Sequence, residues 1–343
     1  MSALATVADW ARHSRNFLRP LPDGDDEVTL PPPLPDGNVV FVPERGEMFV
    51  REAPGASQGP TVLLLHGWTL SADLNWFSGV YDVATRRGRM VAPDLRGHGR
   101  GLRSTEPFTL DAAVEDVAGL IRELELGPVV TVGYSMGGSL SLLLAHRHPE
   151  LVAGMVLAST ALQWRASVRE RAVWAVLGGV EWVMRLGAPE GITDRYLRQA
   201  VEEAPDLKPY RSWLKAEARR GDPVDIAASA KELTRFDARS FAGGLEVPTV
   251  VVVTCNDHLI RADKQRALAD AVPGAKALEV QGAHNAWMVK PEEWAGAIDE
   301  AIDLVLQQIG APARGPATSR ALAPDEVRAT SRPAGRPGRR PKE

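Results

Sequence analysis

The chain has 343 residues, of which 44% are hydrophobic and 24% are charged. This composition is typical of a globular protein and excludes collagen-like, coiled-coil and largely disordered classes. With 40 basic and 44 acidic residues the net charge is only −4, so the sequence provides no strong positive field for nucleic acid.

The single cysteine, Cys255, excludes an intramolecular disulfide and argues against a cysteine-rich metal site. One thiol is typical of a reducing compartment, and we expect a cytoplasmic protein. Charged residues interrupt the first 19 positions, so we expect no signal peptide there. The longest apolar run, near residues 173–184, contains Glu181 and is too short to span a bilayer.

The two ends of the chain differ from its middle. Residues 1–37 combine apolar side chains at helical spacing with a connector rich in Pro and Asp, which predicts an N-terminal helix and a linker. Residues 311–343 carry eight basic and three acidic residues but almost no large apolar ones. We expect this segment to be a disordered basic tail.

Between these ends, short apolar runs alternate with helical patterns. The runs predict strands at 39–42 and 48–51, joined as a hairpin, and at 61–65, 90–92, 129–132, 155–158, 249–253 and 277–280. Helical periodicity covers 111–124, 139–147 and 291–309, with Thr109 as the expected N-cap of the first. This alternation predicts an α/β fold with a mostly parallel sheet covered on both faces.

One long insertion interrupts the alternation. About ninety residues separate the strand near 158 from the strand at 249, and they contain helical patterns at 168–186, 194–203, 210–219 and 227–233. An insertion of this size is typical of a folded subdomain rather than a loop. We expect residues 161–244 to form a helical cap on a core made of residues 38–160 and 245–310.

A nucleophile motif follows the strand at 129–132. Residues 133–137 read Gly-Tyr-Ser-Met-Gly, between a strand and a helix. A sharp turn of this kind exposes the hydroxyl of Ser135, and its flanking glycines avoid collisions in the turn. Ser135 is therefore the candidate nucleophile.

A serine hydroxyl needs a base, and the base needs an acid to orient it. His284 follows the last predicted strand, and Asp257 follows the strand before it. The carboxyl ends of parallel strands share one edge, so both side chains can reach Ser135 there. The order Ser135, Asp257, His284 is that of one hydrolase fold.

The early strand at 61–65 ends in His66-Gly67-Trp68. A backbone N–H group at this position would form an oxyanion hole together with that of Met136. Trp68 is the expected donor because it follows the turn glycine.

Together, these motifs resemble the α/β-hydrolase superfamily, in its serine esterase and lipase-like branch with a helical cap. The motif residues are 66–68, 93–99, 133–138, Asp257 and 282–284, and the resemblance covers about residues 38–310. It implies a mostly parallel eight-stranded sheet and an acyl-enzyme mechanism without cofactor or metal. Serine at 135 argues against the branches that use a carboxylate nucleophile.

The expected reaction is hydrolysis of a carboxylic ester of a hydrophobic small-molecule or lipid-like substrate. We expect the substrate to contact Trp68, Tyr134, Trp164 and Trp287. The same triad also supports hydrolysis of carbon–carbon bonds and perhydrolysis. A further alternative, from another class, is a ligand-binding receptor on a hydrolase scaffold.

Overall fold

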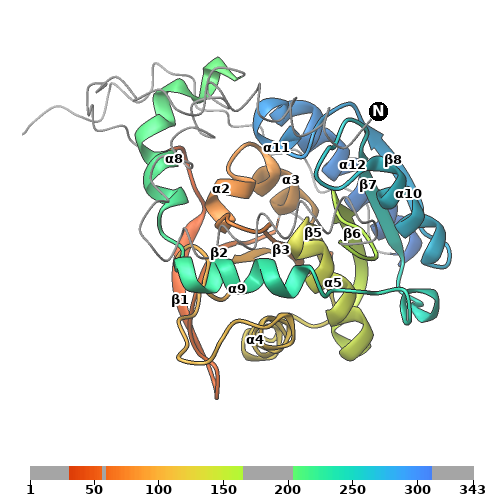
Figure 1. Cartoon of the computed structure of the whole chain (residues 1–343), viewed down its shortest axis with the longest axis horizontal. Coiled ribbons are helices and arrows are strands. Elements are labelled where there is room, and N and C mark those ends of the chain that lie inside the picture. The colour runs from red at the N-terminus through yellow and green to blue at the C-terminus, as the bar shows by residue number, and fades with distance from the viewer. Residues whose placement is uncertain (1–30, 56–58, 165–203, 311–343) are drawn as a thin grey trace, which may run out of the picture.

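The computed structural model describes residues 31–55, 59–164 and 204–310, and its elements are labelled in Figure 1. The predicted N-terminal helix, the basic tail and the predicted helices at 168–186 and 194–203 lie outside the described residues.

Eight strands form one sheet, as expected. They are β1 (Asp36–Val42), β2 (Gly46–Ala53), β3 (Val62–Leu65), β4 (Met90–Pro93), β5 (Val129–Tyr134), β6 (Val152–Ala158), β7 (Thr249–Thr254) and β8 (Lys276–Val280). Their order across the sheet is β1-β2-β4-β3-β5-β6-β7-β8. Strand β2 runs antiparallel to β1 and β4, whereas the pairs from β4 to β8 are parallel. The sheet is open, with β1 and β8 at its edges.

Helices cover both faces of the sheet, as Figure 1 shows. The α-helices of the described residues are α2 (Ala72–Trp76), α3 (Val80–Arg87), α4 (Leu110–Glu123), α5 (Met136–Arg147), α8 (Arg211–Ala218), α9 (Pro223–Leu233), α10 (Ala262–Ala271), α11 (Ala286–Val289) and α12 (Pro291–Gln308). One buried cluster packs α4, α5 and α10 against one face, and a second packs α3, α11 and α12 against the other. Strands β3, β4, β5 and β7 are buried along their whole length, as expected for strands covered on both faces.

The predicted N-cap of α4 is confirmed. The Thr109 hydroxyl accepts a hydrogen bond from the Ala112 N–H at 3.0 Å and caps α4.

Helix α9 begins four residues before its predicted start, because Asp222 caps the Val224 and Asp225 N–H groups and Pro223 fits the first turn. Helices α2 and α11 were not predicted, since four or five residues are too few to show a helical period.

A buried ionic cluster ties β2, α2 and the segment after β4 together. Asp73 is fully buried, and its carboxylate accepts two hydrogen bonds from Arg51, each 2.9 Å, and one from Arg100 at 2.5 Å. The Tyr81 hydroxyl donates a further bond at 3.0 Å. Burial alone would raise the pKa of Asp73, but the hydrogen bonds from Arg51 and Arg100 hold it below its ordinary value of 3.8.

The substitution Asp73→Asn should therefore lower the free energy of unfolding at pH 7 by about 3 kcal/mol. The guanidinium group of Arg51 loses its carboxylate partner, and that of Arg100 keeps only Asp94 and Glu217. A carboxyl with a depressed native pKa contributes stability above its unfolded value near 3.8 and loses it as the pH falls further. Urea unfolding of both proteins should show a constant difference down to about pH 5 and converging curves below 3.8. A difference at pH 7 below about 1 kcal/mol would contradict this role.

Candidate active site

The turn between β5 and α5 holds Ser135 in a strained conformation. Its φ is 54° and its ψ is −112°, angles that a residue with a Cβ atom rarely adopts. Its N–H donates to the Ala158 carbonyl at the end of β6, 2.8 Å away. A Cβ added at Gly133 would lie 2.4 Å from the Gly137 carbonyl oxygen, so the turn requires glycine there.

The structure brings the three predicted catalytic residues together. His284 Nε2 lies 3.1 Å from Ser135 Oγ, and His284 Nδ1 lies 2.7 Å from Asp257 Oδ2. A carboxylate only accepts hydrogen bonds, so His284 carries its proton on Nδ1 and presents a lone pair on Nε2 to the serine hydroxyl. The side chain of Asp257 is fully buried, whereas that of His284 is 22% exposed. The imidazole of His284 is therefore accessible to solvent, whereas the carboxylate of Asp257 is not.

The carboxylate of Asp257 is fixed from several sides. Oδ1 accepts hydrogen bonds from the N–H groups of Leu259 and Ile260 at 2.8 and 2.9 Å. Oδ2 accepts one from the Thr254 hydroxyl at 3.0 Å, in addition to that from His284. These donors leave the carboxylate little freedom to rotate, so it holds the imidazole in one orientation.

The buried amide of Gln265 on α10 supports the same carboxylate. Its oxygen accepts from the Thr254 N–H at 3.0 Å. Its Nε2 donates to the Ile260 carbonyl at 2.6 Å and lies 3.3 Å from Asp257 Oδ2. Thr254 and Gln265 were not predicted as site residues, because neither position matches a motif. Thr254 ends β7 three residues before Asp257, whereas the packing of α10 on β7 brings Gln265 to the carboxylate.

The loop after β3 lies against the start of α5. A Cβ added at Gly137 would lie 1.9 Å from the Leu65 carbonyl oxygen, so only glycine permits this approach. Met136 is the first residue of α5, and its N–H has no acceptor within the helix. The N–H of Gly67 donates to Asn75 Oδ1 at 3.0 Å, which makes it unavailable to a ligand. Trp68 supplies the next N–H along the loop.

His66 and His98 are fully buried behind this loop. Burial lowers the pKa of His66 to about 4 and that of His98 to about 3. His66 Nε2 accepts from the Leu95 N–H at 2.9 Å. The neutral ring of His66 therefore holds the main chain after β4 against the end of β3, which is a structural role.

The residues predicted to contact substrate lie in different surroundings. Trp68 is half-buried, and its Nε1 donates to the Ile226 carbonyl in α9 at 2.8 Å. Tyr134, Trp164 and Trp287 are 1–2% exposed and pack in the two buried clusters. Their role in binding substrate stays a prediction.

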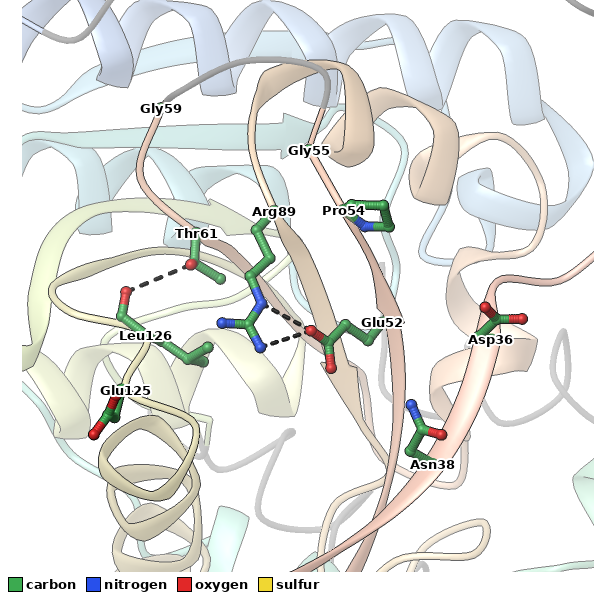
Figure 2. Close-up of a pocket in the computed structure, with 10 residues that line it drawn as sticks. All are labelled: Asp36, Asn38, Glu52, Pro54, Gly55, Gly59, Thr61, Arg89, Glu125 and Leu126. Atoms are coloured by element: carbon green, nitrogen blue, oxygen red, sulfur yellow. Dashed lines mark hydrogen bonds and ion pairs between the residues drawn. The ribbon is translucent and has the colours of Figure 1, made fainter.

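A separate hollow lies at the opposite end of the sheet. Its volume is about 680 Å³, and residues that precede β3, β4 and β5 line it, among them Thr61, Arg89 and Leu126 (Figure 2). Arg89 forms an ion pair with Glu52 inside it at 2.6 Å. Because Ser135 follows β5, this hollow is not part of the candidate site.

Within residues 31–55, 59–164 and 204–310, no set of three or more His, Cys, Asp or Glu side chains is arranged to hold a metal ion. In the same residues no helix combines the length and apolar character needed to cross a membrane.

Comparison with known proteins gives one family model, described as alpha/beta hydrolase fold, which matches residues 60–185. The pimeloyl-[acyl-carrier protein] methyl ester esterase of Chromobacterium violaceum is 27% identical over 72% of this chain and 95% of that protein. The protein of the same name from Xanthomonas campestris pv. campestris is 29% identical over 66% and 88%.

Solved structures share the fold. The enol-lactonase of Burkholderia xenovorans LB400 matches with a TM-score of 0.66 at 21% identity, over 77% of this chain and 99% of that one. A thermophilic esterase from Thermogutta terrifontis matches with a TM-score of 0.65 at 23% identity, over 80% and 99%. At these identities the likeness concerns the fold alone.

The strain at Ser135 predicts an unusual effect on stability. Ser135→Gly should raise the free energy of unfolding by about 1 kcal/mol, since glycine adopts a positive φ without strain. Ser135→Ala keeps the Cβ atom and the strain, so its stability should match that of the parent chain. Chemical denaturation of the three proteins measures the effect. Equal stability of the glycine and alanine variants would mean that the turn is not strained.

Proposed function

We propose that Ser135, His284 and Asp257 form the catalytic triad of this chain, a hydrolase of the carboxylesterase type with the α/β-hydrolase fold. The observation that carries this proposal is the continuous hydrogen-bonded relay from Ser135 Oγ through the imidazole of His284 to the buried carboxylate of Asp257. The proposed reaction is hydrolysis of a carboxylic ester through an acyl-enzyme intermediate.

In the first half-reaction, His284 Nε2 takes the proton of Ser135 as Oγ attacks the ester carbonyl carbon. The new Oγ–C bond converts the carbonyl oxygen to an oxyanion. Asp257 stabilises the imidazolium that forms, and it keeps the ring in the tautomer that can accept the proton. Collapse of the tetrahedral intermediate breaks the bond to the alkoxy group, which leaves as an alcohol with the proton from Nε2.

The N–H groups of Trp68 and Met136 are the proposed donors to the oxyanion. Two features support this assignment: Gly67 already donates to Asn75, and Met136 begins a helix of twelve residues. Backbone donors fixed before the reaction stabilise the developing charge without reorganising, and the dipole of α5 adds to them.

In the second half-reaction, water replaces the alcohol. His284 takes a proton from the water as its oxygen attacks the acyl carbon, and then returns the proton to Ser135 Oγ as the acid is released. The partial exposure of the His284 side chain supports this step, because solvent can approach the base.

We propose that the substrate is a small-molecule ester with an apolar acyl part. Two relatives are named pimeloyl-[acyl-carrier protein] methyl ester esterases, and this supports the ester bond as the target. Helices α8 and α9 belong to the proposed cap, residues 161–244, and the bond from Trp68 Nε1 to Ile226 links this segment directly to the proposed oxyanion loop. A movement of α9 would therefore displace the side chain of Trp68.

The purified chain should hydrolyse p-nitrophenyl acetate, butyrate, octanoate or palmitate, and the preferred length measures the acyl site. Ser135→Ala and His284→Ala should each lower kcat by a factor of about 10⁴ or more. His148→Ala is the matched control, since His148 pairs with Glu115 at the other end of α5. If the folded chain hydrolyses none of these esters, the proposed ester hydrolysis is wrong. Carbon–carbon hydrolysis of diketones and ligand binding without turnover are then the hypotheses to test.

The role of Asn75 gives a second expectation. Asn75→Ala removes the acceptor of the Gly67 N–H, so the oxyanion loop should loosen, with kcat lowered about 10-fold and KM little changed. Asn38→Ala, at an exposed position on β1, controls for the loss of an amide. An increase in KM at constant kcat would instead indicate a contact with bound substrate.

A further inference from the structure

Tyr134 occupies an unusual position among the parts of the proposed active site. It is the last residue of β5 and directly precedes Ser135. Its side chain is 2% exposed and belongs to the buried cluster on the α12 face of the sheet. The rings of Trp287 and Trp294 pack edge-on to it, with centroids 6.5 and 5.7 Å away.

The tyrosine ring also lies against the loop after β3. A Cβ atom added at Gly67 would lie 2.6 Å from Tyr134 Cδ1 and 2.8 Å from Cε1. Gly67 therefore has no room for a side chain, and the face of the ring limits how far this loop can move toward β5. The next residue, Trp68, provides the proposed oxyanion donor.

The hydroxyl of Tyr134 reaches the third part of the site. It donates a hydrogen bond to the main-chain carbonyl of His284, and the two rings lie 5.2 Å apart at 40°. The loop that carries His284 lies between β8 and α11 and is also joined to the Asp257 loop by the bond from Asn256 N–H to the Gly282 carbonyl, at 3.0 Å. Tyr134 adds a link from the His284 residue itself to the nucleophile turn.

We propose that Tyr134 is a positioning residue, which sets the imidazole of His284 and the oxyanion loop relative to Ser135, rather than a residue that contacts substrate. The proposal rests on the proposed ester hydrolysis. A ring covered on both sides, with its hydroxyl bonded to a backbone carbonyl, has no surface left for an acyl chain. The side chain of Tyr134 thus contacts the loops of the base and the oxyanion donor, and its main chain is joined to Ser135 by a peptide bond.

The variant Tyr134→Phe removes the hydroxyl and keeps the ring. We expect kcat for a p-nitrophenyl ester to fall about 10-fold and KM to stay within twofold, because a small misplacement of the base slows chemistry without weakening binding.

Tyr81→Phe is the matched control. Tyr81 is also buried, and its hydroxyl donates to Asp73 at 3.0 Å, away from the triad. Both variants should lose some stability in thermal unfolding, but only Tyr134→Phe should lower kcat while KM stays within twofold. Titration with a fluorophosphonate counts the competent sites, so that kcat refers to active protein in each sample.

The outcomes separate this inference from the proposed function. Ester turnover that depends on Ser135, together with an unchanged kcat in Tyr134→Phe, would overturn the positioning role alone. A raised KM at constant kcat would also overturn it, in favour of a substrate contact. Turnover that survives in Ser135→Ala would overturn the proposed triad and this inference with it.

Discussion

The sharp, strained turn at Ser135 is the constraint on which the rest of the candidate site depends. It places a hydroxyl at the carboxyl end of β5, where the segments after β7 and β8 bring Asp257 and His284 within hydrogen-bond reach. Three residues that lie 149 positions apart at the extremes meet because the parallel strands end at one edge. Glycine at 133 and 137 permits the close backbone approaches that the turn requires.

The sequence could predict the fold and the three central residues because each has a local signal. The nucleophile turn has a motif between strand and helix, and Asp257 and His284 each follow an apolar strand directly. The supporting residues have no such signal. Asn75 and Gln265 sit on helices and reach the site only through packing, so their spacing in the sequence contains no information about their contacts.

The sequence also could not predict which aromatic side chains face a ligand and which pack in the core. Tyr134 belongs to a strand that is buried on both faces, and such a strand does not reveal which side chains point toward a ligand. In the structure its ring packs with Trp287 beneath the nucleophile turn. Trp68 differs, since its indole bonds to α9 while its backbone lies in the proposed oxyanion loop. Ion pairs form a second link between the core and the proposed cap, because Arg100 pairs with both Asp73 on α2 and Glu217 on α8.

The most direct test of the proposed acyl-enzyme mechanism is to trap the covalent intermediate. The chain is mixed with a p-nitrophenyl ester, quenched in acid and digested, and the peptides are analysed by mass spectrometry. We expect one acyl group per chain, located on Ser135, and no acyl group when His284 is replaced by alanine. An acyl group on another residue, or product release without any adduct on Ser135 under conditions that trap a serine esterase, would contradict the central role of the turn.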